Sequence, residues 1–269
     1  MIQLPALTTP KPAADVPDRP LDSIVLPGDL ADRVRALLAE WEQSEKLARY
    51  GMTPRNRVLL YGPPGNGKAT LAAAIATELK MPLTVIPHSE ISSGTMGQQS
   101  KQLVAAFQPT KRAKCILFFD ECDSLCNRRS THGDSASKEE NNTVNALLMA
   151  LDQLPSTCVV IFATNFPQVL DPAFARRINL HLEMPAPDLD DLRRLHQSLL
   201  RRHPLWPIAD FPIDTCGAPS FAVCEQMIQD FARAKILDPR FDPLNLAGKP
   251  RSAWLRDQLA KQTPKPATV

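Results

Sequence analysis

Short, mostly apolar runs alternate with stretches of helical periodicity through the first two thirds of the chain. The runs predict five β-strands, at 57–61, 83–86, 115–119, 158–163 and 180–184. Apolar side chains at helical spacing predict helices at 29–50, 68–80 and 100–107, and another around 144–154. Short apolar strands that alternate with helices are typical of a parallel sheet covered on both faces. We therefore predict an α/β fold.

The pattern changes after Pro185. The segment 188–202 is amphipathic, begins with acidic residues and ends with basic ones, an order that the helix dipole favours. A second amphipathic helix is predicted at 221–237, and no convincing strand pattern follows the proline. We therefore expect a large αβα domain at 21–185 and a small helical lid domain at 186–240.

Three further segments lack a clear apolar pattern. Residues 1–20 carry five prolines and predict an extended arm. The polar stretch 127–142 predicts a long loop. Residues 241–269 contain proline and lysine and predict a tail with one short helix at 252–262.

Composition narrows the class of protein. The chain has 269 residues, 43% apolar and 22% charged, so it can bury a substantial core. Its net charge of +2 creates no general attraction for nucleic acid or for an anionic membrane, and no DNA-binding motif is present. No run of about 18 apolar residues predicts a membrane-spanning helix. Residues 1–20 lack the pattern of a signal peptide, so a cytoplasmic location is expected.

The six cysteines could form disulfides or bind zinc. However, Cys115 and Cys158 lie in apolar runs that predict buried strands. The pairs 122/126 and 216/224 lack C-x-x-C spacing, and histidine is scarce near them. Free thiols, as in cytosolic proteins, are therefore the better prediction.

A Gly/Pro-rich segment lies between the first predicted strand and an Ala-rich helix. It consists of Gly62, Pro63, Pro64, Gly65, Asn66, Gly67 and Lys68. Its glycines would let backbone N–H groups turn toward phosphates, the helix N-terminus would add positive charge, and the lysine would reach the terminal phosphates. An ordinary turn is the alternative, but the strand, the spacing and the lysine together favour an ATP-binding P-loop.

One position departs from the P-loop pattern. The motif places Ser or Thr directly after the lysine, where the hydroxyl binds Mg²⁺, but Ala69 occupies this position. Thr70 follows, yet one helical step rotates its side chain about 100° away. ATP binding can persist on the backbone and Lys68, while metal positioning and hydrolysis would suffer. An engineered replacement and a natural loss both remain open as explanations.

Polar residues follow two other predicted strands. Asp120 and Glu121 end the apolar run at 115–119, which would deliver both carboxylates to the edge where phosphates lie. Asp120 would hold Mg²⁺, and Glu121 would polarise the attacking water. Asn165 follows the next apolar run, where it could orient that water instead of merely forming a turn.

Two adjacent arginines, Arg176 and Arg177, follow a short Leu-Asp-Pro-Ala segment. Paired arginines usually form a solvated surface. The alternative is an arginine finger, supplied by one subunit to the phosphate bound by its neighbour.

Together these segments resemble the AAA family of P-loop ATPases, particularly its katanin/spastin branch and small stand-alone bacterial members. LLYGPPGNGKAT, ILFFDECDSLCNRR and VVIFATNFPQVLDPAFARR are similar to its Walker A, Walker B and sensor-1-to-arginine-finger segments, in family order. The resemblance covers about 21–237. It implies a five-stranded αβα core with a helical lid, ATP and Mg²⁺ at the subunit interface, and usually a hexamer.

The resemblance also assigns roles near adenine and in the pore. Val25, with its two neighbours, stands where the family cradles adenine by backbone contacts, and Ser220-Phe221-Ala222 stands where the lid usually has Ser-Gly-Ala. The first pore loop corresponds to 94–97, where Thr95 replaces the usual aromatic residue and Met96 can still contact a polypeptide. The second pore loop corresponds to 129–138.

Two functions follow from these interpretations. In the first, a homo-oligomeric ring, in most cases a hexamer, uses ATP to remodel a protein substrate or partner complex. In the second, ATP binding orders a switch or scaffold that recruits a partner enzyme with little mechanical work. The missing pore aromatic favours the second, and the arginine pair favours the first. A DNA-associated ATPase is a third reading, against which the near-neutral charge argues.

Overall fold

The computed structural model describes residues 15–92, 98–126 and 135–238. Within these ranges the chain forms two compact units. The sheet unit contains residues 15–21, 30–62 and 68–183, with the gaps just given, and the lid unit contains 22–29, 63–67 and 184–238. The short segment 63–67, at the centre of the predicted P-loop, therefore belongs with the lid unit.

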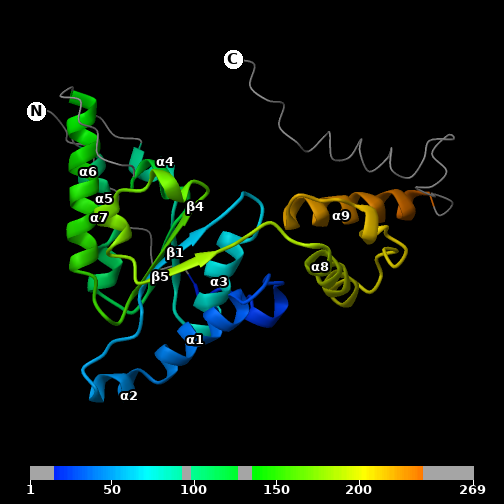
Figure 1. The fold of residues 1–269 in the computed structure, drawn as a ribbon, viewed down its shortest axis with the longest axis horizontal. Helices are drawn as coiled ribbons and strands as arrows, with labels where there is room; N and C mark the ends of the chain where they lie inside the picture. Colours follow the sequence, from blue (N-terminus) through cyan, green and yellow to red (C-terminus); the bar gives the residue numbers. More distant parts are fainter. Residues whose placement is uncertain (1–14, 93–97, 127–134, 239–269) are drawn as a thin grey trace, which may run out of the picture. The chain divides into compact units, whose positions relative to one another are not determined.

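A five-stranded parallel sheet forms the centre of the sheet unit (Figure 1). Its strands are β1 (Arg57–Tyr61), β2 (Leu83–Ile86), β3 (Ile116–Phe119), β4 (Val159–Thr164) and β5 (Leu180–Glu183), in the spatial order β2-β3-β4-β1-β5. All four pairings are parallel, so the carboxyl ends of the strands meet at one edge. The predicted α/β fold and all five predicted strands are confirmed, each strand to within one residue at either end.

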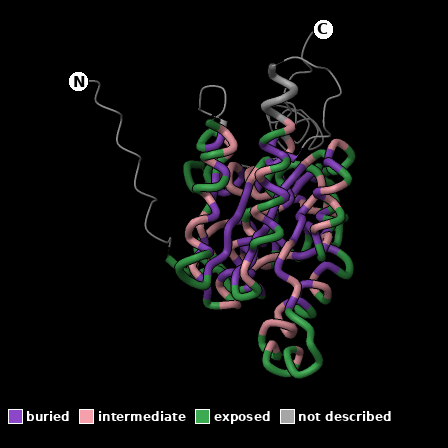
Figure 2. Tube along the Cα trace, turned by 90° about the vertical axis from the view of Figure 1, so that its left-hand side faces the viewer, coloured by how far each residue is buried: buried purple, intermediate pink, exposed green. Residues whose placement is uncertain are grey.

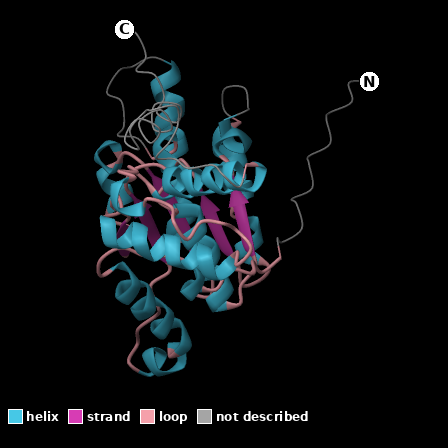
Figure 3. Ribbon diagram, turned by 90° about the vertical axis from the view of Figure 1, so that its right-hand side faces the viewer, coloured by secondary structure: helices cyan, strands magenta, loops and turns pink. Residues whose placement is uncertain are grey.

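Helices cover both faces of the sheet (Figures 1 and 3). One side carries α1 (Leu30–Glu42) and α3 (Lys68–Leu79), and the other carries α5 (Gln99–Ala106), α6 (Ser135–Asp152) and α7 (Pro172–Ala175). Two further helices of the described part of this unit are α2 (Ser44–Arg49) and α4 (His88–Ser92). Single turns of 3₁₀-helix lie at Leu21–Ser23 (η1), Gln108–Lys111 (η2), Cys122–Ser124 (η3) and Pro167–Val169 (η4).

The three central strands β1, β3 and β4 are mostly buried on both sides, as the tube in Figure 2 shows, whereas the edge strands β2 and β5 are partly exposed. Successive side chains on a strand point to opposite faces of the sheet, so they pack against different groups of helices. Leu117, Phe119 and Phe162 pack into the core beneath α5 and α6. Within this core, the Phe162 ring stacks on Phe119 and meets Phe174 of α7 edge to face, with ring centroids 5.0 Å apart in both pairs.

Truncating this aromatic cluster should destabilise the sheet unit strongly. Phe162 is completely buried, so Phe162→Ala would leave a cavity between two rings and cost about 3–5 kcal/mol. Urea denaturation followed by circular dichroism measures the change. Val104→Ala, at an exposed position on α5, is the control and should change stability by less than about 0.5 kcal/mol. Similar losses for both variants would contradict this account of the core.

The lid unit contains two longer helices, α8 (Leu189–Arg202) and α9 (Phe221–Leu237), and a 3₁₀ turn η5 (Ile213–Thr215). Asp188 and Asp191 form a reciprocal capping box at the start of α8. Apolar side chains of both helices form one buried core, which includes Leu199, Met227 and Phe231. The two helices predicted after residue 185 are confirmed.

Two predictions about helices were wrong. The stretch 127–142 was predicted to be a loop throughout, but α6 begins at Ser135. Its first turns carry polar residues such as Lys138 and Glu139, which favour helix by propensity but give no apolar period. The single helix predicted at 29–50 is two helices that meet at Gln43. The predicted arm up to residue 14 and the tail with its helix at 252–262 lie outside the described residues.

Candidate nucleotide site

The backbone of the predicted P-loop has the conformation that its glycines allow. β1 ends at Tyr61, α3 begins at Lys68, and three intervening glycines have positive φ: Gly62 at 140°, Gly65 at 78° and Gly67 at 84°. A Cβ atom at Gly65 would also lie only 2.8 Å from the Ser220 hydroxyl oxygen. Side chains at these positions would strain the turn, which leaves a loop of bare backbone ahead of a helix N-terminus.

Contacts within the lid unit hold this loop. The Ala222 backbone N–H donates to the Gly65 carbonyl oxygen at 3.0 Å, and the Asn66 amide donates to the Pro185 carbonyl oxygen at 3.1 Å. Ser220 caps α9, because its hydroxyl accepts from the Val223 N–H. These contacts with Pro185 and Ala222 were not anticipated, because backbone hydrogen bonds between distant segments leave no pattern in a sequence.

Val25 and Phe221, to which the family resemblance assigns places near adenine, both make apolar contacts in the lid unit. Val25 and Phe221 are partly buried and pack against the apolar core of the lid unit. Phe221, which stands where the family usually has glycine, therefore contributes to lid packing. Their proposed places near adenine stay predictions.

Lys68 joins the P-loop to the end of β4. Its Nζ donates to the Gly62 carbonyl oxygen and to the Asn165 side-chain oxygen, both at 2.7 Å. Partial burial lowers the pKa of Lys68 below its ordinary value, while the negative charges of Asp120 and Asp123 oppose this effect. The structure thus brings Lys68, Asn165 and Asp120 to the carboxyl edge of the sheet.

The two Walker B carboxylates lie on a sharp turn after β3. The Asp120 side chain accepts a hydrogen bond from the Glu121 N–H at 3.0 Å. Glu121 itself has φ of 51°, in the left-handed region that a residue with a side chain rarely adopts. Such strain costs about 1–3 kcal/mol and clusters at functional sites. Glu121 is exposed, so its carboxylate is accessible to water.

The two arginines differ in their surroundings. Arg177 forms a two-point ion pair with Asp152 of α6, at 2.8 and 2.9 Å, and donates to the Ala173 carbonyl oxygen at 3.1 Å. Arg176 is exposed, and its side chain has no hydrogen bond or ion pair within the described part of the chain. Both follow α7, whose N-terminus is capped by the buried Asp171.

The position after Lys68 offers no metal ligand. Ala69 is exposed in the first turn of α3, and Thr70 is partly buried one step further along the helix. Among the described residues, no group of three or more His, Cys, Asp and Glu side chains could hold a metal ion unaided. A Mg²⁺ ion here would depend on Asp120 and on phosphate oxygens. The bare loop and Lys68 fit a triphosphate, whereas the metal position lacks one expected protein ligand.

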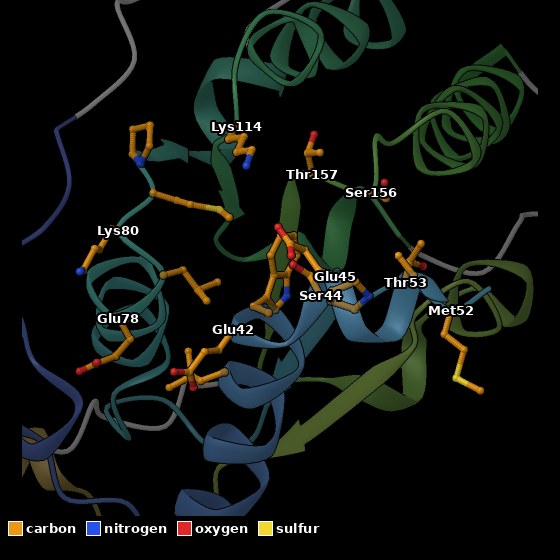
Figure 4. Close-up of a pocket in the computed structure, with 17 residues that line it drawn as sticks. Glu42, Ser44, Glu45, Met52, Thr53, Glu78, Lys80, Lys114, Ser156 and Thr157 are labelled. Atoms are coloured by element: carbon orange, nitrogen blue, oxygen red, sulfur yellow. The ribbon is translucent and has the colours of Figure 1, made fainter. Parts of the chain in front are cut away.

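A separate groove lies at the opposite edge of the sheet (Figure 4). Its volume is about 930 Å³, and its lining includes Pro54, Pro82, Lys114 and Thr157, which precede β1, β2, β3 and β4. No residue of the predicted nucleotide site lines it. Because nucleotides bind at the carboxyl ends of parallel strands, this groove at their amino ends is not the nucleotide site.

Comparisons with known proteins agree with this geometry. Residues 58–186 match the family model described as ATPase family associated with various cellular activities (AAA). Residues 58–186 therefore form an AAA-family domain. The match spans β1 to β5 and includes every predicted catalytic residue of the AAA domain.

Three relatives show how far the similarity extends. A 26S proteasome regulatory subunit 10B homolog of Arabidopsis thaliana is 35% identical over 65% of this chain and 47% of its own length. The peroxisomal ATPase PEX6 of Neurospora crassa is 30% identical over 88% of this chain but only 18% of its own length. An AAA family ATPase of Sinorhizobium fredii, y4kL, is 28% identical over 88% of this chain and 72% of its own length. The chain thus spans less than half of the proteasome relative.

Among the described residues, no helix combines the length and apolarity that crossing a bilayer requires. All six cysteines are buried free thiols. The predicted pore loop at 94–97 lies outside the described residues. So does most of the second at 129–138, of which only the backbone from 135, at the start of α6, is described.

Proposed function

We propose that this chain binds ATP with Mg²⁺ and hydrolyses it as a subunit of a homo-oligomeric ring. The contact between Lys68 and Asn165 is the observation that carries the proposal. It joins the lysine of the P-loop to the polar end of β4, beside β3, which Asp120 follows directly. The Gly62 and Asn165 oxygens that accept from Lys68 are uncharged, so a phosphate oxygen, which is charged, would be a stronger acceptor than either.

The roles of the individual residues follow from their positions. The bare backbone of 62–67 and the start of α3 would bind the phosphates, and Lys68 would neutralise the terminal one. Asp120 would hold Mg²⁺, which offsets negative charge on the phosphates as the bond to the leaving group breaks. Glu121, exposed on its strained turn, would accept a proton from the attacking water. Asn165 would orient that water, and Arg176 would reach the phosphate bound by a neighbouring subunit.

We further propose that the ring, most simply a hexamer, remodels a protein substrate or partner complex. The similar proteins include a subunit of the proteasome and a peroxisomal ATPase. A cytoplasmic location fits the use of ATP and the free thiols, which persist in reducing compartments. The specific substrate would be a protein, because the net charge of +2 provides no general attraction for nucleic acid.

Assembly and nucleotide binding can be tested together. Sedimentation velocity of the full chain, with and without MgATP, should show a shift from small species to one of ring size. Lys68→Ala should bind ATP at least about tenfold more weakly, because it removes a charge-assisted contact, and should not assemble. Lys80→Ala, directly after the end of the same helix, is the control for loss of a lysine and should bind ATP and assemble like the parent. Failure of the parent to assemble at any nucleotide concentration would refute the ring.

Ala69 favours a second function, a nucleotide-gated switch or scaffold that recruits a partner enzyme. Without the hydroxyl that positions Mg²⁺, binding would continue while turnover is slow. The two functions differ in one measurable way. A switch would assemble with ATP and hold a partner with negligible hydrolysis, whereas a remodelling ring would hydrolyse ATP faster when its substrate is added.

A further inference from the structure

We propose that Asp123 is a positioning residue, which holds Asn165 in place through the hydroxyl of Thr164. This inference rests on the proposed ATPase function and adds a residue to which none of the sequence arguments gave a role. Asp123 lies in η3, directly after the Walker B pair, and Thr164 is the last residue of β4. The Asp123–Thr164 bridge therefore connects the two strand ends that present Glu121 and Asn165.

The bridge is partly buried and holds its threonine at two points. Thr164 is only 1% exposed, and its hydroxyl donates to the Asp123 carboxylate. The same hydroxyl oxygen accepts from the Phe166 backbone N–H at 2.9 Å. The Thr164 side chain thus holds the backbone on both sides of Asn165. A buried hydroxyl with both a donor and an acceptor satisfied has one preferred rotamer, so this stretch of backbone is fixed.

The consequence reaches the phosphate-binding lysine. Asn165 accepts from Lys68 Nζ at 2.7 Å, so the residues Asp123, Thr164, Asn165 and Lys68 form one connected chain. Asp123 also acts on Lys68 by charge, since its carboxylate favours the protonated lysine against the effect of burial. Asp123 therefore acts on Asn165 and Lys68 in two ways, through its hydrogen bond to Thr164 and through its negative charge. Substitutions can remove one of these effects and keep the other.

The turn that carries Asp123 also needs support. Glu121 has a strained positive φ. The turn η3, which follows Glu121 in the chain, packs against β4. Strained backbone persists only where neighbouring contacts determine it. The bond from Asp123 to Thr164 supplies such a contact two residues beyond Glu121. Loss of the bridge should thus disturb both Glu121 and Asn165, while the hydrogen bonds that hold Gly65 and Asn66 stay in place.

The test compares substitutions that keep or remove the bridge, in the full chain and in its Ala69→Thr form. Asp123→Ala and Thr164→Val remove it, and each should lower kcat for ATP about tenfold or more with KM within about threefold. Thr164→Ser keeps the hydroxyl, and Asp123→Asn keeps an acceptor oxygen without the charge, so both should stay within about threefold of the parent. The double variant Asp123→Ala/Thr164→Val should be no worse than the worse single variant.

A second measurement tests whether the Asp123–Thr164 bridge fixes the backbone, and it does not depend on ATP hydrolysis. Hydrogen exchange at the Phe166 amide should be about tenfold faster in Asp123→Ala and Thr164→Val, and unchanged in Thr164→Ser. Thr110→Val is the matched control, because Thr110 is also buried and donates its hydroxyl proton to a carbonyl, that of Phe107. It should lower the unfolding midpoint without changing kcat or exchange at Phe166.

Three results would overturn the proposal. If Asp123→Asn lowers kcat as much as Asp123→Ala does, the negative charge of Asp123 matters, through Lys68 or the metal, and not its hydrogen bond to Thr164. Additive losses in the double variant would show that the two residues act separately. Unchanged exchange at Phe166 in Asp123→Ala would show that the bridge does not hold the backbone. If neither parent form hydrolyses ATP, the proposed hydrolysis fails, and the exchange measurement alone decides whether the bridge exists.

Discussion

Ala69→Thr should raise the rate of ATP hydrolysis about 10²-fold, which corresponds to about 2.7 kcal/mol of activation free energy. The substitution supplies the hydroxyl that P-loops use to bind Mg²⁺. Ala69 is exposed in the first turn of α3, so a threonine there meets no packed side chain. The helix propensity of threonine would cost at most about 0.7 kcal/mol of stability. Steady-state release of phosphate at saturating ATP measures the change.

Two further variants make this result interpretable. Ala73→Thr introduces the same side chain about one helical turn later on α3 and should leave turnover unchanged. Glu121→Gln, combined with Ala69→Thr, should abolish the gain, because the amide cannot accept the water's proton. Should Ala69→Thr leave turnover near zero while ATP still drives assembly, the switch or scaffold function would replace the remodelling ring.

The strands and the P-loop could be predicted because their signals are local. Apolar runs such as 159–164 cannot be exposed, and Gly62, Gly65 and Gly67 all take the positive φ that only glycine adopts freely. The family resemblance implies the same number of strands, whereas their spatial order was not predicted. The first turns of α6 could not be predicted from apolar periodicity, because their sequence carries no apolar stripe.

Parts of the candidate site could be placed by sequence, but their contacts could not. Asp120 and Asn165 were placed at the carboxyl edge because each follows an apolar run. The partner of Arg177 was invisible, because Asp152 lies 25 residues earlier and pairs with it only through the packing of α6 against α7. The role of Asp123 could not be predicted for the same reason, since its partner Thr164 is 41 residues away. The sequence shows which residues are polar, and the fold decides which of them meet.

The two arginines should therefore differ in function. Arg176→Ala should lower kcat about 10³-fold without changing the unfolding midpoint, because a trans-acting arginine stabilises charge on the transferred phosphoryl group and Arg176 has no partner among the described residues of its own chain. Arg177→Ala should lower stability instead. It removes a partly exposed ion pair with Asp152, which contributes at most about 1 kcal/mol, and a bond to the Ala173 carbonyl. Asp152→Asn is the matched variant, which keeps the bond to Ala173, and should reproduce only the part of the loss of stability that the ion pair contributes.

Mixing inactive subunits tests whether Arg176 acts on a neighbour, in chains that carry Ala69→Thr. An Arg176→Ala subunit keeps Glu121, and a Glu121→Gln subunit keeps Arg176, so neither forms an active site with copies of itself. In a mixed ring, the ATP site of the first receives the arginine of the second, and activity should return to a substantial fraction of the parent's. Arg177→Ala, mixed in the same way, should show no such recovery beyond its own activity. If mixing does not restore ATP hydrolysis with Arg176→Ala subunits, Arg176 does not act on a neighbouring subunit. The ion pair of Arg177 with Asp152 would then not separate the roles of the two arginines.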